Sequence, residues 1–537
     1  MRVWMILFAW GVSIALSGCS ERVSIDQRPN ILLIVADDLG FTDIGAFGSE
    51  IQTPNLDQLA FGGVRLTNFH ADRACQQTRV MMMASSGVSA ALEYRSPQDG
   101  GQRANRLSLN WATLPELLQD AGYRTYMAGK WDLGLEDGYT PATRGFDHSF
   151  AQLGASASHF AEILWGERSL YELDGHPVEY QDLPENFYST NYYTQKMLEF
   201  LRSNEEETPW FGYLPYTTPH WPLQVPENEL ERYAGQYEGG YDALRSSRVA
   251  RADELGVLPT GLALEDFVPV APPWIELTEE EQRRYSRAQE IYAAMIENLD
   301  ANVGRLVNYL EESGQLANTV IMFTSDHGAS SGEHGQSPGG RPQIPDFIDN
   351  SFSNWGRENS FVDHGLGFAE AATAPLKGHK GRISEGGLRA AALINFPRLL
   401  NQGEVNGTFM TMMDILPTFL DIAGTEHPGE IIYRGREIND IVGRSAWPHL
   451  TGLTETIHLP MDTAGWTSVA RYDSQAPLGA LIRGNYKITN QIPAEGTRST
   501  SWQLYDISID PGETEDIASQ YPDLMAELVE EWENNWR

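Results

Sequence analysis

Adjacent side chains that could bind a metal occur at two places where a predicted buried strand ends. Asp37 and Asp38 follow one continuous apolar run, and Asp326 and His327 follow another. Neighbouring carboxylates repel one another unless a cation compensates them, so two such groups favour a metal site. The alternative is capping of the next helix, a common role for Asp after a strand. Carboxylate oxygens suit calcium or magnesium, whereas the nitrogen of His327 would also accept manganese or zinc.

A single cysteine lies between these two acidic groups in the chain. Cys75 stands at a predicted helix start, and Arg79 follows it four residues later. The guanidinium and the helix N-terminus would favour the thiolate form of Cys75. The alternative is a small buried hydrophobic residue. The one other cysteine is Cys19, near the N-terminus.

Three basic side chains stand in turns that could hold them in place. The sequence has only five lysines, and two of them, Lys130 and Lys380, are flanked by glycine; His220 stands between two prolines. The alternatives are a solvated surface for the lysines and a hydrogen-bonded core position for the histidine. The net charge of −36 would repel an anionic substrate, so a site for one would need such a cluster of cations.

Strands and helices alternate along most of the chain. We predict strands at 30–36, 123–128, 210–215 and 319–324, and helices beginning at 53 and covering 114–121, 275–313 and 409–423. This order is typical of a parallel, doubly wound sheet, whose ligands bind beyond the carboxyl ends of the strands. Residues 329–370 are rich in Gly, Ser, Pro and Asn and are predicted to form a long loop over the site.

The C-terminal part of the sequence has a different pattern. Short predicted strands at 480–489 and 502–504 precede a final helix at 522–536. A chain of 537 residues is too long for one core. We therefore predict a large α/β domain at 29–449 and a small domain at 450–537 with an antiparallel sheet and one helix.

The N-terminus carries an export signal. One positive charge precedes an apolar run that is too short for a comfortable membrane span, and the run ends in Leu16-Ser17-Gly18-Cys19, which resembles the lipobox of bacterial lipoproteins. We predict a signal peptide at 1–18, a lipid anchor on Cys19, a tether at 19–28 and a periplasmic or outer-membrane-anchored protein. The alternative is a plain signal peptide. By charge, nucleic acid and an anionic membrane surface are poor partners.

Six motifs together resemble those of the sulfatase family of the alkaline phosphatase superfamily, and bacterial arylsulfatases most closely. They are Val35-Ala36-Asp37-Asp38-Leu39-Gly40, Cys75-Gln76-Gln77-Thr78-Arg79, Gly129-Lys130-Trp131, Pro219-His220-Trp221-Pro222, Ser325-Asp326-His327-Gly328 and Glu385-Gly386-Gly387-Leu388-Arg389. The resemblance runs from about residue 29 to the C-terminus. It implies a large α/β domain with a mixed, mainly parallel sheet between helices, followed by a small antiparallel domain.

The resemblance also implies a chemistry. In that family a separate formylglycine-generating enzyme oxidises the cysteine to formylglycine (3-oxoalanine), whose hydrate sits on calcium and attacks sulfur. It implies one divalent metal, for which Ca²⁺ is the first candidate. Mn²⁺ or another ion is the alternative, because His327 offers a nitrogen ligand. The roles carried over are metal binding for Asp37, Asp38, Cys75, Asp326 and His327, and catalysis for Cys75, Arg79, Lys130, His220 and Lys380.

Three positions depart from the family pattern. Gln77 replaces the Pro that the formylglycine-generating enzyme reads, Asp132 replaces a His beside the sulfate, and His327 replaces an Asn ligand. Three functions therefore remain: hydrolysis of small or glycan sulfate esters, hydrolysis of phosphoesters or phosphonates with Cys75 unmodified or otherwise, and binding of an anion or glycan without turnover. Retention of the other charged motif residues favours a sulfate-ester hydrolase with a Cys75-derived nucleophile.

Overall fold

The computed structural model describes most of the chain. The described residues are 28–93, 105–161, 163–164, 167–168, 170–204, 208–259, 262, 269–332, 348–468, 478–490 and 501–537. The predicted signal peptide, Cys19 and residues 20–27 of the tether lie outside them, as does the segment 333–347 of the predicted long loop.

A ten-stranded sheet forms the centre of the large domain, in the order β11-β10-β7-β6-β12-β1-β13-β14-β2-β15. Its five middle strands run parallel: β7 (His148–Gln152), β6 (Arg124–Lys130), β12 (Trp210–Pro215), β1 (Asn30–Ala36) and β13 (Thr319–Ser325). Antiparallel pairs add β10 (Tyr171–Leu173) and β11 (His176–Val178) at one end, and β14 (Ala392–Asn395) and β2 (Val64–Leu66) at the other. The edge strand β15 (Glu404–Asn406) pairs parallel with β2. The prediction of a mixed, mainly parallel sheet is confirmed.

Strand β1 shows why these residues form a central strand. All seven of its residues are buried, which is typical of a parallel strand covered on both faces. Its side chains alternate between two cores, with Leu32 and Ile34 in one and Ile31, Leu33 and Val35 in the other.

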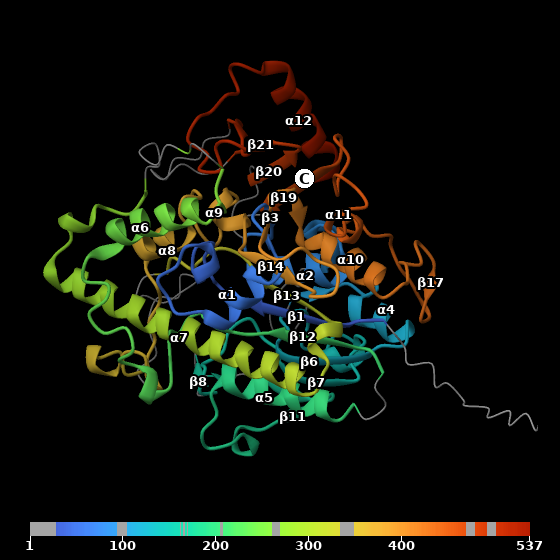
Figure 1. Cartoon of the computed structure of the whole chain (residues 1–537), viewed down its shortest axis with the longest axis horizontal. Coiled ribbons are helices and arrows are strands. Elements are labelled where there is room, and N and C mark those ends of the chain that lie inside the picture. Colours follow the sequence, from blue (N-terminus) through green and yellow to red (C-terminus); the bar gives the residue numbers. More distant parts are fainter. Residues whose placement is uncertain are drawn as a thin grey trace, which may run out of the picture.

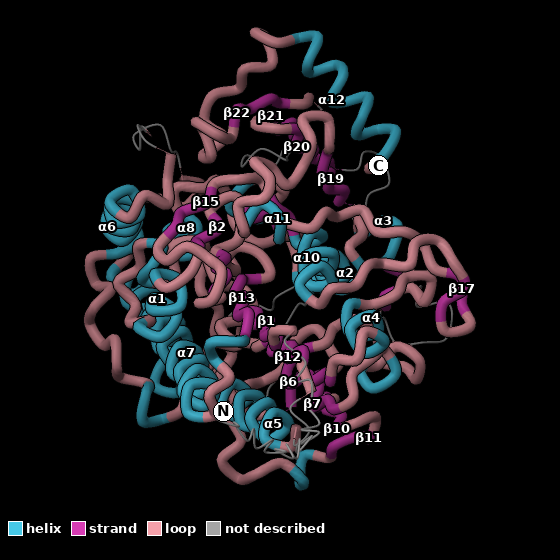
Figure 2. The backbone as a smooth tube through the Cα atoms, turned by 45° about the vertical axis from the view of Figure 1, so that its right-hand side comes forward, coloured by secondary structure: helices cyan, strands magenta, loops and turns pink. Residues whose placement is uncertain are grey.

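Helices cover both faces of the sheet (Figures 1 and 2). The first core contains residues of α1 (Pro54–Phe61), α5 (Ser189–Arg202), α6 (Gly240–Glu254), α7 (Glu279–Glu312) and α8 (Leu366–Thr373). The second contains residues of α2 (Cys75–Ala84), α3 (Val88–Ala91), α4 (Leu114–Asp120), α9 (Glu385–Leu388), α10 (Ile415–Ile422) and α11 (Trp447–Leu450). In Figure 2, α5 and α7 lie on one side of the strands and α2, α4 and α10 on the other.

A second, four-stranded antiparallel sheet lies in the C-terminal part, at the top of Figure 1. It comprises β19 (Thr463–Ser468), β20 (Leu478–Arg483), β21 (Tyr486–Thr489) and β22 (Gln503–Asp506), and α12 (Pro522–Asn535) packs on it. Leu481, Ile488 and Leu504 share a small core with Leu528 and Trp532 of α12. The small α+β unit predicted for this region is present.

Several predicted elements differ from the observed ones. The strand predicted at 480–489 is a hairpin, because Gly484 has φ +59 and the chain reverses there. The helix predicted at 409–423 begins only at Ile415, since Met410 and Thr411 form strand β16, which pairs with β3 (Phe69–His70). The end of the predicted loop 329–370 is helical, because α8 begins at Leu366.

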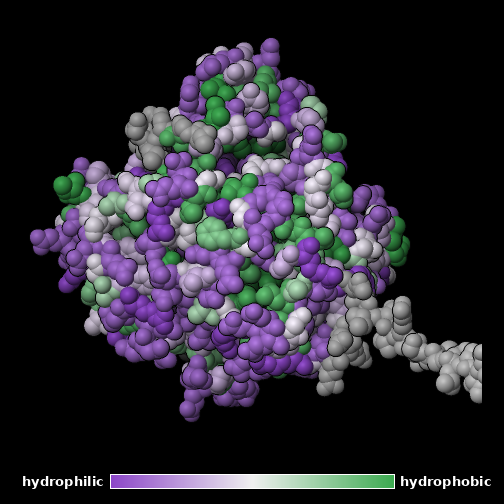
Figure 3. Space-filling view, viewed as in Figure 1, coloured by the Kyte–Doolittle hydropathy of each residue, from purple (hydrophilic) through white to green (hydrophobic). Residues whose placement is uncertain are grey.

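The remaining short strands form small pairs outside the main sheets. They are β4 (Leu92–Glu93) with β5 (Arg106–Leu107), β8 (Ile163–Leu164) with β9 (Glu167–Arg168), and β17 (Ile432–Tyr433) with β18 (Arg436–Glu437). The face shown in Figure 3 is largely hydrophilic, with smaller apolar areas between. Within the described ranges, no helix is both long and apolar enough to span a bilayer.

Candidate active site

The register of the central strands places the two acidic pairs side by side. Ala36 at the end of β1 pairs with Ser325 at the end of β13, so Asp37 and Asp326 leave the sheet next to each other. The backbone N–H of Asp326 donates to the Ala36 carbonyl at 3.0 Å. Asp38 has φ 70, a left-handed conformation that is uncommon outside glycine, and its N–H faces Asp326 Oδ1 at 3.3 Å. The tertiary structure thus converts two sequence motifs into one carboxylate cluster.

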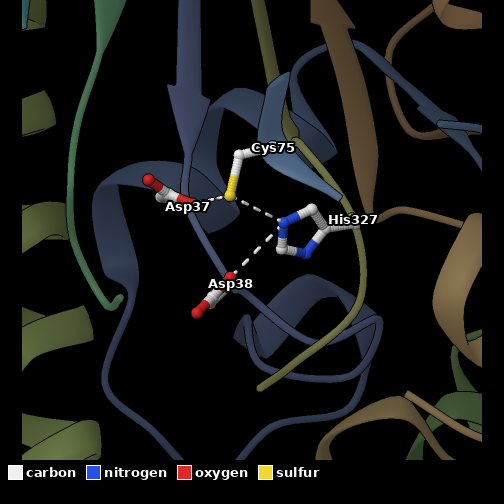
Figure 4. A group of neighbouring side chains, drawn as sticks. All are labelled: Asp37, Asp38, Cys75 and His327. Carbon is white, nitrogen blue, oxygen red and sulfur yellow. Dashed lines mark hydrogen bonds and ion pairs between the residues drawn. The ribbon is translucent and has the colours of Figure 1, made fainter. Parts of the chain in front are cut away.

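Cys75 reaches this cluster from the first residue of α2. Its Sγ lies 3.3 Å from Asp37 Oδ1 and 3.2 Å from His327 Nε2 (Figure 4). Ligand atoms of Asp37, Asp38, Cys75 and His327 all lie within 4.8 Å of one another, and all four residues are buried. The structure therefore brings together the predicted centre of the site.

Three basic side chains contact the carboxylates of the cluster. Lys130 Nζ lies 2.6 Å from Asp37 Oδ2, and Lys380 Nζ lies 2.5 Å from Asp38 Oδ1. Arg79, one turn after Cys75 on α2, places Nη2 3.2 Å from Asp326 Oδ2. These are the cations that an anion site in a strongly acidic protein needs.

The same cations shift the protonation of the acids. Burial alone would raise the pKa of Asp37, but Lys130 and the other nearby cations hold that pKa well below its ordinary value. Burial raises the pKa of Asp38 to about 6, although Lys380 opposes the shift. Burial would lower the pKa of Lys130, but its carboxylate partner Asp37 raises it, so the lysine stays charged.

The sequence-based expectation of a thiolate at Cys75 is wrong for the protein without a metal. Burial, reinforced by the Asp37 carboxylate, raises the pKa of the Cys75 thiol well above its ordinary value, and this outweighs Lys130 and Lys380. The helix N-terminus and Arg79 are both in place, but Arg79 is occupied by Asp326 and Asp37. Cys75 is therefore a neutral thiol among these residues.

His220 lies at the edge of the cluster on the loop after β12. Its Nδ1 must donate to the Trp221 carbonyl at 2.6 Å, because a carbonyl oxygen only accepts. The other nitrogen, Nε2, is 3.7 Å from Asp38 Oδ2. Burial lowers the pKa of His220 well below its ordinary value, so the ring is neutral, with a lone pair on Nε2.

Sequence reasoning missed the residue that positions this loop. His159 Nε2 donates to the His220 carbonyl at 3.0 Å, while its Nδ1 lies 2.8 Å from Ser189 Oγ. Burial lowers the pKa of His159 to about 4, which keeps it neutral. His159 stands in no motif, so only the tertiary contact identifies it.

Sequence reasoning also missed the buried ionic network behind the Lys380 loop. Lys487 Nζ lies 2.8 Å from Glu385 Oε1 and 2.8 Å from Glu513 Oε1, and His70 Nε2 donates to Glu385 Oε2 at 2.9 Å. Glu385 opens α9, whose Gly386 N–H donates to the Lys377 carbonyl. The glutamate of the Glu385 motif is thus structural, and it ties β21 of the small sheet to the loop that carries Lys380.

Of the three departures from the family pattern, His327 is part of the cluster and Asp132 lies beside it. The Gln76 side-chain amide donates to the Asp132 carbonyl at 2.9 Å, so the residue after Cys75 is fixed to the segment that follows Lys130. Asp132 has φ 55, and burial raises the pKa of its carboxyl to about 6. Among the described residues, no hydrogen bond reaches that carboxyl group. Gln77 is only partly buried on the outer side of α2.

The donor set fits a divalent cation. Asp38 Oδ2 is buried and has no hydrogen-bond partner among the described residues. Burial of an unpaired carboxylate oxygen costs free energy, and a bound cation would offset this cost. Carboxylate oxygens, an imidazole nitrogen and a sulfur surround the same small volume. Asp326, also predicted as a ligand, places Oδ1 3.4 Å from His327 Nε2.

The fold is an α/β fold of the alkaline-phosphatase-like class. Residues 29–425 match the model of the sulfatase family, and the chain belongs to that family. Its class is that of the sulfuric ester hydrolases.

Relatives agree with this assignment, and solved structures share the fold. The chain is 40% identical to an uncharacterized sulfatase of Schizosaccharomyces pombe over 94% of this chain and 93% of that protein. It is 34% identical to the arylsulfatase of Klebsiella aerogenes over 78% and 91% of the two chains. The fold is similar to that of Ps i-CgsB in complex with k-i-k-neocarrahexaose, with a TM-score of 0.67, 21% identity and coverage of 94% and 92%. It is also similar to a phosphonate monoester hydrolase of Agrobacterium radiobacter, with a TM-score of 0.55, 18% identity and coverage of 94% and 95%.

Proposed function

We propose that the chain hydrolyses sulfate esters with a nucleophile derived from Cys75, at a site that depends on one divalent metal. One observation carries the proposal: the Cys75 side chain lies among Asp37, Asp38 and His327, with Lys130 and Lys380 adjacent. The side chains proposed as nucleophile, metal ligands and anion-binding lysines are thus close together, which supports the proposal.

Asp37, Asp38, Asp326 and His327 would hold the metal, together with the group at position 75. When bound, such an ion lowers the pKa of an attached hydroxyl and offsets negative charge on the transferring sulfate. Carboxylate oxygens make Ca²⁺ the first candidate, and the His327 nitrogen makes Mn²⁺ the second. Conversion of Cys75 to 3-oxoalanine by a formylglycine-generating enzyme would supply a hydrated aldehyde with the attacking hydroxyl.

The lysines would bind the sulfate oxygens. In the structure Lys130 and Lys380 neutralise Asp37 and Asp38, and a metal at those carboxylates would leave the lysines free to pair with the substrate. Fixed cations in a buried site stabilise charge that builds up on the sulfuryl oxygens without costly reorganisation. Arg79 would keep Asp326 and the position-75 group oriented.

His220 would act at the ester oxygen that leaves. Its ring is held by the Nδ1–Trp221 hydrogen bond, and Nε2 faces the cluster with a lone pair. A neutral imidazole can take a proton at Nε2 and pass it to a departing alkoxide. The His159 hydrogen bond to the His220 carbonyl would keep this geometry.

The test measures the Cys75 modification and the activity of the same sample. Protein isolated from its native host should give a Cys75 peptide about 18 Da lighter than the thiol form. It should also release the alcohol from an aryl sulfate, and Asp326→Ala should abolish that release while the protein stays folded. An unmodified thiol together with absent aryl-sulfate turnover would refute the proposed function.

A phosphoester or phosphonate hydrolase is the second candidate. Gln77 at the position of the modification-signal proline favours it, because an unconverted Cys75 could not form the aldehyde hydrate. Aryl phosphate and phosphonate monoester substrates, assayed beside the aryl sulfate, distinguish the two activities. Turnover of none of them would leave an anion-binding or glycan-binding protein.

We further propose a small or glycan sulfate ester as substrate and a lipid-anchored, exported location. Support for a glycan comes from fold neighbours, one of which is described in complex with D-glucosamine-2-N,6-O-disulfate. Support for the location is the Leu16-Ser17-Gly18-Cys19 sequence. Cys19→Ala should move the protein from the membrane fraction to the soluble fraction; if it stays with the membrane, the anchor proposal is wrong.

A further inference from the structure

The centre of the site contains an unusual combination of donor atoms. A thiol sulfur, an imidazole nitrogen and two carboxylates meet within 4.8 Å (Figure 4). Calcium and magnesium prefer oxygen ligands only, whereas sulfur and nitrogen donors suit zinc and other transition metals. As long as Cys75 remains a cysteine, the donor set is therefore that of a softer metal.

His327 is held in the form that a metal ligand needs. Its Nδ1 lies 2.9 Å from the Gly328 carbonyl and must donate to it. In the neutral ring that metal binding requires, the lone pair is then on Nε2, which lies 3.2 Å from Cys75 Sγ and 3.4 Å from Asp38 Oδ1. A metal-binding histidine commonly donates its other N–H to a backbone carbonyl in this way, which fixes the tautomer and the ring orientation.

Each carboxylate has one oxygen without a lysine contact. Lys130 and Arg79 occupy Asp37 Oδ2, which leaves Oδ1 beside Cys75. Lys380 occupies Asp38 Oδ1, and Oδ2 has no hydrogen-bond partner within the described ranges. At Asp38 it is Oδ1 that faces His327 Nε2, so an ion bound there would displace Lys380 from this oxygen.

The spacing of the donors also fits zinc. Zinc bonds of about 2.3 Å to sulfur and about 2.0 Å to nitrogen, at a tetrahedral angle, separate the two donors by about 3.5 Å. The observed separation of Cys75 Sγ and His327 Nε2 is 3.2 Å. A shift of a few tenths of an ångström would thus accommodate the ion.

We infer that the chain with unconverted Cys75 binds one zinc-class transition metal through Cys75 Sγ, His327 Nε2 and the carboxylates of Asp37 and Asp38. Binding releases the thiol proton to solvent and leaves the oxidation state of the metal unchanged. Conversion of Cys75 removes the sulfur donor, so the metal preference shifts toward ions that favour oxygen. The inference shares the metal site of the proposed function but does not depend on sulfatase turnover.

The experiment uses the full chain, produced in a host without a formylglycine-generating enzyme and checked by mass for an intact Cys75 thiol. After treatment with a chelator, the protein is equilibrated with Zn²⁺ and excess Ca²⁺, and bound metal is measured by elemental analysis. We expect one zinc per chain. Loading with Co²⁺ should give the near-ultraviolet absorption of a thiolate–cobalt bond, a readout independent of activity.

Two variants and one control complete the test. Cys75→Ser should remove the cobalt–thiolate band, and Cys75→Ser and His327→Asn should each weaken zinc binding by more than about 100-fold, the upper range for an outer-sphere partner. Cys19→Ser, which removes the other thiol, should change neither readout. Zinc displaced by calcium, or unaltered zinc affinity in Cys75→Ser, would overturn the inference. Loss of aryl-sulfate activity in mature protein would instead bear on the proposed function alone.

Discussion

Replacement of Lys487 by Met tests whether the buried ionic network holds the small sheet against the active-site loop. Lys487 is fully buried and is within 2.8 Å of both Glu385 and Glu513. Met has a similar length and no charge, so Lys487→Met removes the cation between two buried acidic side chains. His70 and Arg389 still contact Glu385, but Glu513 loses its lysine partner and the two acids repel each other.

The expected loss of stability is large. Removing one partner of a buried ion pair typically costs about 3–5 kcal/mol, because the remaining charge stays buried and unpaired. Two carboxylates share the same lysine here, so we expect a loss of about 4 kcal/mol, reduced to the extent that one of them takes up a proton. Burial already raises the pKa of Glu513, which identifies it as the acid that would protonate first.

The assay is equilibrium unfolding in urea, followed by fluorescence of the 14 tryptophans. Arg483→Met is the matched control, since Arg483 lies on the neighbouring strand β20 and pairs with Glu527 at the surface, where ion pairs contribute little. That variant should unfold at the wild-type midpoint. If Lys487→Met costs less than about 1 kcal/mol, the network does not stabilise the fold as argued.

Three further outcomes follow. Glu385→Gln should weaken the loss of unfolding free energy that wild type shows at acidic pH. Lys487 and other cations overcome burial and lower the Glu385 pKa, so the contribution of this carboxylate is present above about pH 4.5 and is lost as the pH falls. Urea midpoints that change with pH as they do in wild type would contradict this. Asp132→Asn should raise the ratio of kcat/KM for an aryl phosphate to kcat/KM for an aryl sulfate about tenfold. The reason is that a carboxylate beside Lys130 repels a dianionic phosphate more than a monoanionic sulfate ester. An unchanged ratio would count against this. Gln77→Pro, co-expressed with a formylglycine-generating enzyme, should raise the aldehyde fraction in peptide mass spectra, and equal fractions would show that Gln77 is not limiting.

Local sequence was sufficient for the framework of the site. A continuous apolar run followed by acidic residues identified β1 and β13, and the parallel arrangement placed Asp37 and Asp326 at one edge of the sheet. The turn predicted at Lys380 is present, and Gly381 beside it has φ +85. The turn predicted at Lys130 is wrong, because Gly129 and Lys130 are the last residues of strand β6, which pairs with β7. The features that were predicted correctly depend on neighbours in the chain, so the chain order alone reveals them.

Boundaries that depend on distant partners were predicted less well. The helix expected from 409 starts at Ile415, because Met410 and Thr411 pair with a strand more than 300 residues earlier. The hairpin at Gly484 was read as one strand, since both of its arms have strand-like composition. Hydrophobic pattern alone does not show where such a pairing ends.

The sequence by itself determined which side chains could form the site: the acidic pairs, Cys75, the two lysines and His220. Only the tertiary structure decided their chemical states. It made Cys75 a neutral thiol, turned Nε2 of His327 toward it, and buried Lys487 behind the Lys380 loop. The reason is physical, since burial and charge–charge distances set a pKa, and both depend on residues hundreds of positions apart.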